Sequence, residues 1–236
     1  MKLISFEQNG SNRIGAIENG FIYDFHSIDS NISDSMLGFL QGGEVQMNLA
    51  NKAIDGGKTS IPIDSVKLLS PLSNPPSVRD AYAFRQHVAT ARKNRGLEMI
   101  PEFDEIPIFY FTNHNAVFGP GNFPVLKRHT EKLDFELECA AIIGKGGRNI
   151  SVSEADNYIT GFMIMNDFCW NNLIFTIFTV KGIRRFNRSR FQCGGHRYNF
   201  ICRARLIGIR NCPVGKSGNI ITPVFIGIKI WNRCHS

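Results

Sequence analysis

The chain has 236 residues, of which 43% are hydrophobic and 11% aromatic, so it is long enough to bury a core as one large or two small domains. No apolar run approaches the roughly 18 residues that a membrane-spanning helix needs. The early acidic residue Glu7 is also atypical of a secretory signal peptide. We therefore expect a cytoplasmic protein without a membrane partner.

The net charge of +7 is distributed unevenly along the chain. Residues 168–236 hold 12 of the 27 lysines and arginines but no aspartate or glutamate, which leaves 15 basic and all 20 acidic residues in 1–167. Five of the six cysteines also lie beyond residue 168. A mildly acidic protein therefore carries a wholly basic tail, and the composition changes near residue 168.

The first segments predict short strands joined by tight turns. The segments 2–8, 13–17 and 21–25 are predicted as strands. Between these segments lie Asn9-Gly10 and Asn19-Gly20, dipeptides that favour two-residue hairpin turns. The chain therefore begins with a small antiparallel sheet.

Helical segments are predicted next, within residues 30–54. Asp34 is a candidate N-cap, and Gly42 with the glycine after it predicts a break between two helices. Three prolines between residues 71 and 76 are typical of a linker. We therefore place a domain boundary near residue 72.

Apolar residues at helical spacing predict one helix over 77–95, closed by Gly96. Asp80, Phe84 and His87 would lie on one face of that helix, because they are spaced i, i+4 and i+7. An acid and a histidine on one face can belong to the same cleft. The alternative is that His87 is a structural residue, which is the commoner role of a histidine on a partly apolar face.

Three carboxylates alternate along the segment that leads into the apolar run 139–144. In a strand, Asp134, Glu136 and Glu138 share one face because side chains two residues apart point the same way. Such a cluster is unfavourable when buried, since like charges repel and lose hydration. A hard divalent cation removes that cost and prefers oxygen ligands. The alternative is a solvated strand face that binds no ion.

A further carboxylate follows the second apolar strand, which is predicted at 159–165 after a short helix at 152–158. That strand is expected to end at Asn166-Asp167. A carboxylate at the exit of a buried strand can present a ligand at the rim of a core. The alternative is a turn formed by the Asn-Asp pair.

These segments resemble the catalytic domain of the fumarylacetoacetate hydrolase family, and the resemblance covers residues 69–167. Order, spacing and residue types all agree with the family's motifs. The segments that carry it are Arg79–Phe84 with His87, Tyr110–His114, Gly119–Gly121, Leu133–Glu138 and the strand before Asp167.

The resemblance implies an α+β, β-rich fold. Residues 73–236 would form a mixed β-roll or sandwich, the fumarylacetoacetase-like catalytic domain, which is truncated or aberrant from about residue 168. Residues 1–72 would form the small N-terminal accessory domain of longer members. A complete fold would form a homodimer.

The resemblance also implies roles for individual residues. His87 matches the general base that activates water, and Tyr82 and Tyr110 match residues that contact the substrate. The metal would be Mg²⁺ or Ca²⁺, with Mn²⁺ as a further candidate. The positions that match the metal ligands are Asp80, Glu136, Glu138 and Asp167.

The implied activity is hydrolysis of a carbon–carbon bond in a small oxo-acid of the β-diketone or acylpyruvate type, as in aromatic amino acid catabolism. Some relatives instead decarboxylate, hydrate or isomerise small oxo-acids. Elementary chemistry agrees, since a divalent cation polarises a carbonyl and stabilises developing negative charge. A neutral imidazole, with an ordinary pKa near 6.5, is suited to take a proton from water.

Beyond Asp167 the resemblance is expected to end. Residues 168–175 contain no arginine, glutamine or acid where the family carries substrate-binding ones, and Lys181 is the nearest counterpart of its catalytic lysine. We hypothesise that the tail is a shifted-frame translation. The alternative to an active hydrolase is then a non-catalytic, truncated family member.

Two other interpretations of the tail are weaker. Its arginines and aromatic residues could bind a nucleic acid, but no known nucleic-acid module contains them. Cys193 and His196 have an acceptable spacing for one half of a metal site, but the sequence has no second pair of ligands at a matching spacing. Neither interpretation displaces the shifted-frame hypothesis.

Overall fold

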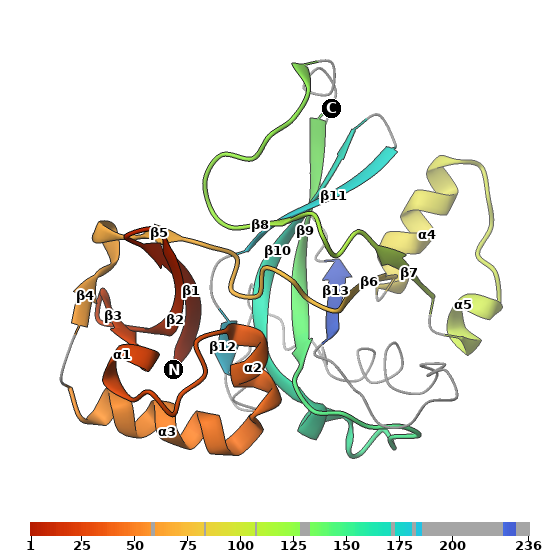
Figure 1. Cartoon of the computed structure of the whole chain (residues 1–236). Helices are drawn as coiled ribbons and strands as arrows, with labels where there is room; N and C mark the ends of the chain where they lie inside the picture. Colours follow the sequence, from red (N-terminus) through yellow and green to blue (C-terminus); the bar gives the residue numbers. More distant parts are fainter. Residues whose placement is uncertain are drawn as a thin grey trace.

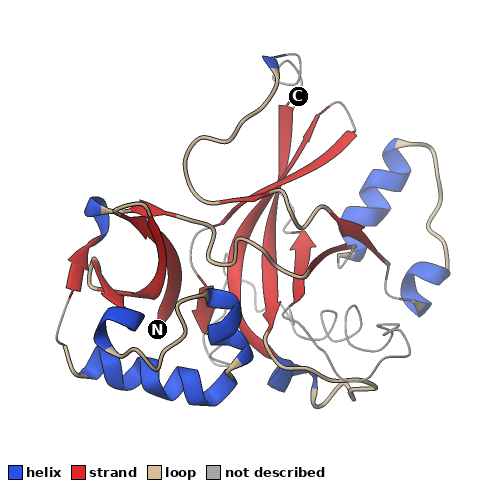
Figure 2. Cartoon of the chain, in the orientation of Figure 1, coloured by secondary structure: helices blue, strands red, loops and turns tan. Residues whose placement is uncertain are grey.

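The computed structural model describes residues 1–57, 60–82, 84–106, 108–127, 133–170, 173–180, 183–185 and 224–229. The described strands form one 13-stranded sheet whose main path runs β4-β3-β2-β1-β12-β10-β9-β13-β6-β7. The sheet curls, and short helices lie at its margins (Figures 1 and 2). The predicted β-rich α+β class is therefore confirmed.

The N-terminal part of the sheet is the predicted meander. Its turns place both central residues in the left-handed region, with φ of +52° at Asn9 and +76° at Gly10, then +50° at Asn19 and +82° at Gly20. Such turns match the twist of antiparallel strands. The three strands are β1 (Lys2–Gln8), β2 (Ser11–Glu18) and β3 (Phe21–Asp24).

Three helices follow, and two short strands then lead to residue 68. The hydroxyl of Ser35 accepts the Gly38 N–H at 3.2 Å, so the cap of the second helix is Ser35 and the prediction of Asp34 was wrong by one residue. The elements are α1 (Phe25–Ile28), α2 (Met36–Gln41), α3 (Gly43–Asp55), β4 (Ser60–Pro62) and β5 (Lys67–Leu68).

The main hydrophobic core extends from the N-terminal region into the strands beyond it. Phe25 and Phe39 are fully buried, and their rings stack with centroids 5.4 Å apart. The same buried cluster includes Ile142 and Met165 from later strands. The core therefore crosses the boundary that the sequence predicts near residue 72.

The part of the chain from residue 77 onward supplies all the remaining described strands. Its elements, in chain order, are β6 (Ser77–Ala81), α4 (Arg85–Asn94), α5 (Glu102–Glu105), β7 (Phe109–Thr112), β8 (Val117–Phe118), β9 (Leu133–Ile143), β10 (Ile159–Trp170), β11 (Leu173–Val180), β12 (Ile183–Arg185) and β13 (Val224–Lys229).

The prediction of one helix over 77–95 was wrong. Ser77–Ala81 is strand β6, which pairs with β13 on one side and with β7 on the other. Pairing with two strands distant in the sequence outweighs the local helical spacing. The helix begins only at Arg85, and it ends as predicted before Gly96, whose φ is +71°.

Two other predicted boundaries were also wrong. The segment predicted as a helix over 152–158 contains only a 3₁₀ turn, Ala155–Tyr158. Strand β10 does not end at Asp167 but continues to Trp170, because β9 and β11 pair with it there. Asp167 thus lies inside a strand.

Among the described residues, no helix has the length and apolarity that crossing a bilayer requires.

Candidate metal centre

Strand register brings four carboxylates toward one point. Asp167 on β10 lies directly opposite Glu136 on β9, and Glu138 follows two residues later on the same face. Asp80 comes from β6, which β13 separates from β9 in the sheet. Two adjacent strands and one more distant strand therefore contribute to a single site.

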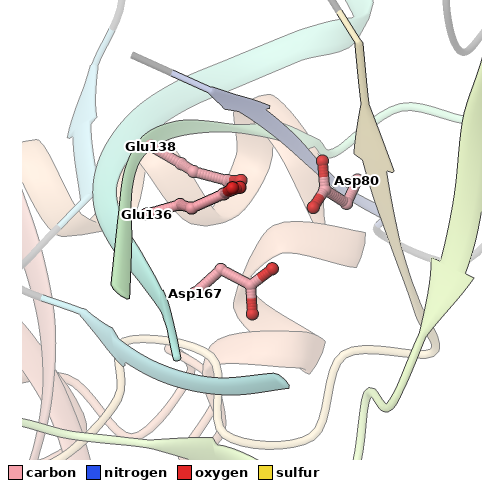
Figure 3. A group of neighbouring side chains, drawn as sticks. All are labelled: Asp80, Glu136, Glu138 and Asp167. Carbon is pink, nitrogen blue, oxygen red and sulfur yellow. The ribbon is translucent and has the colours of Figure 1, made fainter. Parts of the chain in front are cut away.

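The four side chains converge, as Figure 3 shows. One ligand atom from each of the four residues lies within 4.8 Å of those of the other three. The Asp80 and Glu138 side chains have no solvent exposure, and Asp167 is only 3% exposed. Glu136 is partly buried. This arrangement brings together the four residues that the family resemblance implies as metal ligands.

The donor set fits a hard divalent cation. Four carboxylates so close together in a buried site repel one another, and burial removes their hydration. A cation such as Mg²⁺ or Ca²⁺ takes six or more oxygen ligands and offsets both effects. The four residues supply neither thiolate nor imidazole, the ligands that are typical of zinc sites.

Asp134 lies outside this cluster, although its position in the alternation matches that of Glu136 and Glu138. It is exposed at the start of β9, and its Oδ1 accepts the N–H of Phe135 at 2.8 Å. Alternation predicts which face a side chain takes but not how far the sheet covers that face. Only two of the three alternating acids, Glu136 and Glu138, therefore belong to the carboxylate cluster.

Tyr110 reaches into the cluster from β7. It lies directly opposite Asp80 in the pair formed by β6 and β7. Its hydroxyl donates to Oδ2 of Asp80 at 2.5 Å and approaches Oδ2 of Asp167 at 3.2 Å. Burial, followed by the charges of Asp80 and Asp167, raises the pKa of the phenol, so it keeps its proton. These two contacts depend on strand register, so no short sequence pattern predicts them.

His87 and Tyr82 lie together beside a small cavity. His87 is in the first turn of α4, and its ring centroid is 6.3 Å from that of Tyr82. The cavity has a volume of about 220 Å³, and none of the four carboxylates lines it. The described residues around it are Tyr82, His87, Val88, Ala91, Arg92, Arg95, Ile100, Phe103 and Ile108.

The predicted pairing of Asp80 and His87 on one helix face was therefore wrong. Asp80 belongs to a strand and His87 to the helix that follows it. The structure places Asp80 in the carboxylate cluster and His87 in the cavity. The roles of His87 as base and of Tyr82 and Tyr110 as substrate contacts stay predictions. Lys181 lies outside the described residues.

One family model matches the central part of the chain. Residues 77–189 match the family model described as fumarylacetoacetate (FAA) hydrolase C-terminal. The match ends at residue 189, which is 22 residues past Asp167, so it continues beyond the expected limit. The shifted-frame origin of the tail stays a hypothesis.

Curated relatives share the same kind of domain. A fumarylacetoacetate hydrolase domain-containing protein 2 homolog from Dictyostelium discoideum is 26% identical over 172 residues, which are 71% of this chain and 54% of the relative. The mitochondrial oxaloacetate tautomerase fahd2 of Xenopus laevis is 25% identical over 171 residues, 71% of this chain and 51% of the relative. The chain spans about half the length of these relatives.

Solved structures confirm the fold. The maleylpyruvate hydrolase from Sphingobium sp. SYK-6, in complex with manganese(II) and pyruvate, matches with a TM-score of 0.59 and 19% identity, over 78% of this chain and 67% of that one. The fumarylacetoacetate hydrolase from Exiguobacterium antarcticum matches with a TM-score of 0.50 and 28% identity, over 73% of this chain and 57% of that one.

Proposed function

Because the chain belongs to the fumarylacetoacetate hydrolase family, we propose that it is a divalent-metal-dependent enzyme for small oxo-acids. The proposed reaction is hydrolysis of a carbon–carbon bond in a β-diketone acid of the acylpyruvate type. The observation that carries the proposal is the convergence of four carboxylates within 4.8 Å.

The ligands in this proposal are Asp80, Glu136, Glu138 and Asp167, and the ion is Mg²⁺ or Ca²⁺. Mn²⁺ is a third candidate, supported by the manganese in the maleylpyruvate hydrolase structure. When bound, the ion supplies Lewis-acid polarisation of a carbonyl and stabilises the negative charge that develops on oxygen. The anionic cage thereby becomes a site for an anionic substrate.

In this proposal, residues of the cavity that contains His87 handle the substrate and its proton. A ring nitrogen of His87 takes a proton from water, for which neutral imidazole is suited near pH 7. Tyr82, which shares the cavity with His87, contacts the substrate. Apolar side chains in the cavity wall keep bulk water away from the substrate chain. They include Val88, Phe103 and Ile108.

A second candidate is keto–enol tautomerisation of an oxo-acid. It is favoured by the oxaloacetate tautomerases among the relatives. This reaction needs the same carboxylate cage but only moves a proton between carbon and oxygen, so it requires no attacking water. The two candidates therefore give His87 different roles, because only hydrolysis requires it to activate a water molecule.

An activity assay with added Mg²⁺, Mn²⁺ or Ca²⁺ tests the proposal. Acylpyruvate cleavage and oxaloacetate tautomerisation are both followed by the loss of enol absorbance, and released pyruvate distinguishes cleavage. We expect ion-dependent turnover by the wild-type chain, retained in Asp134→Asn and lost in Glu138→Gln. Asp134→Asn is a matched control because Asp134 is exposed on the same strand. Absence of both reactions with every ion would refute the proposal.

A homodimer and a place in aromatic amino acid catabolism are parts of the same proposal. So is a cytoplasmic location, although several relatives carry the word mitochondrial in their names. Sedimentation of the purified chain and fractionation of its host cells check the first and the last of these.

A further inference from the structure

The Tyr110 hydroxyl joins two sides of the carboxylate cluster that come from distant strands. Asp80 lies directly across from Tyr110, and directly opposed side chains share a face of the sheet. Asp167 belongs to β10, which β9, β13 and β6 separate from β7 in the strand order. The hydroxyl reaches both carboxylates, at 2.5 Å and 3.2 Å, only because the sheet curls.

We propose that Tyr110 is a positioning residue that orients the carboxylates of Asp80 and Asp167 for the ion. The inference rests on the proposed function, because it concerns the same four ligands. Tyr110 is neither one of those ligands nor required here to touch the substrate.

One phenolic proton serves both aspartates. The short hydrogen bond engages one oxygen of Asp80, and the longer contact engages one oxygen of Asp167. Each contact fixes the rotation of the carboxylate group about its bond to Cβ. The second oxygen of each carboxylate is then directed to the ion. The hydroxyl dipole also lies between two negative groups and reduces their repulsion before an ion enters. Residues that orient metal ligands in this way typically change ion affinity by about 10–100-fold when they are removed.

The phenol hydroxyl supplies one donor within hydrogen-bond distance of both carboxylates. Hydrogen bonds to ionised carboxylates are also stronger than those between neutral groups.

Calorimetric titration with Mn²⁺ or Mg²⁺ tests the inference on three forms of the full chain. Tyr110→Phe removes only the hydroxyl. Tyr23→Phe removes a hydroxyl from β3, outside the strands of the cluster, and is the matched control. We expect Tyr110→Phe to bind the ion about 10–100-fold more weakly, and Tyr23→Phe to bind as the wild type does. Melting temperatures without the ion show that both variants fold.

The outcomes separate this inference from the proposed function. A wild-type chain that binds no divalent ion contradicts the proposed function itself. A wild-type chain and a Tyr110→Phe variant that bind equally tightly overturn only the role of Tyr110.

A second measurement applies if Tyr110→Phe does not fold. The chain has five tyrosines, and incorporation of 3-fluorotyrosine gives each a fluorine resonance. In a Tyr82→Phe background, saturation with Mg²⁺ should shift the resonance of Tyr110 and leave that of Tyr23 on β3 unchanged. An unchanged Tyr110 resonance would overturn the inference.

Discussion

The N-terminal region and the carboxylate cluster follow opposite rules. In residues 1–57, tight turns lie at Asn-Gly pairs, Ser35 caps a helix, and Phe25 and Phe39 fill an apolar core. In the cluster, by contrast, Asp80 and Glu138 are charged residues without solvent exposure. Local rules and the global fold agree in the first region and conflict in the second. Such conflicts are characteristic of functional sites.

The largest expected effect lies in the N-terminal region. Phe39→Ala should lower the free energy of unfolding by about 3–5 kcal/mol, because it empties a buried aromatic site that stacks on Phe25. Urea unfolding measures the change. The control is Phe21→Ala, which removes a ring that is 45% exposed and should cost much less. Equal costs at the two positions would contradict the assigned core.

The cluster should respond in the opposite way when one of its charges is removed. Without an ion, Glu138→Gln should be at least as stable as the wild-type chain, because one repulsive carboxylate is gone. At an ion concentration of about 100 Kd, the wild type should gain about 2.7 kcal/mol and the variant should gain none. Thermal unfolding with and without Mg²⁺ measures both quantities. Ion stabilisation that survives in Glu138→Gln would show that the ion binds elsewhere.

A smaller effect sharpens the difference between local and long-range determinants. Ser35→Ala should cost about 1 kcal/mol of folding stability, because the Gly38 N–H loses its acceptor. Ion affinity should not change. Asp34 is exposed and lies one residue earlier, so Asp34→Ala should lower the folding stability by only about a few tenths of a kcal/mol. A larger loss at Asp34 than at Ser35 would move the cap back to the residue that the sequence predicts.

The two regions also differ in how much of each could be predicted from sequence. The meander needed only short patterns, since Asn9-Gly10 and Asn19-Gly20 specify their turns locally. The alternation of side chains along a strand correctly predicted that Glu136 and Glu138 share one face of β9. The family resemblance supplied Asp80 and Asp167 as ligand positions, and the structure brings all four carboxylates together.

Features that depend on distant strands were missed. Ser77–Ala81 was included in a helix because apolar residues recur at helical spacing from Ala81 onward, but pairing with β13 and β7 makes it a strand. Asp134 follows the same alternation as Glu136, but its end of the sheet is exposed. The contacts of Tyr110 required both the register against Asp80 and the curl that brings Asp167 near. No short sequence pattern specifies register or curl.

Diffraction from crystals grown with Mn²⁺, measured at a wavelength where manganese scatters anomalously, tests the central claim most directly. We predict one anomalous peak among Asp80, Glu136, Glu138 and Asp167, at roughly 2.0–2.6 Å from their oxygens, the range of hard divalent cations. A cluster that stays without a peak at saturating Mn²⁺, or a peak held by other residues, would contradict the claim.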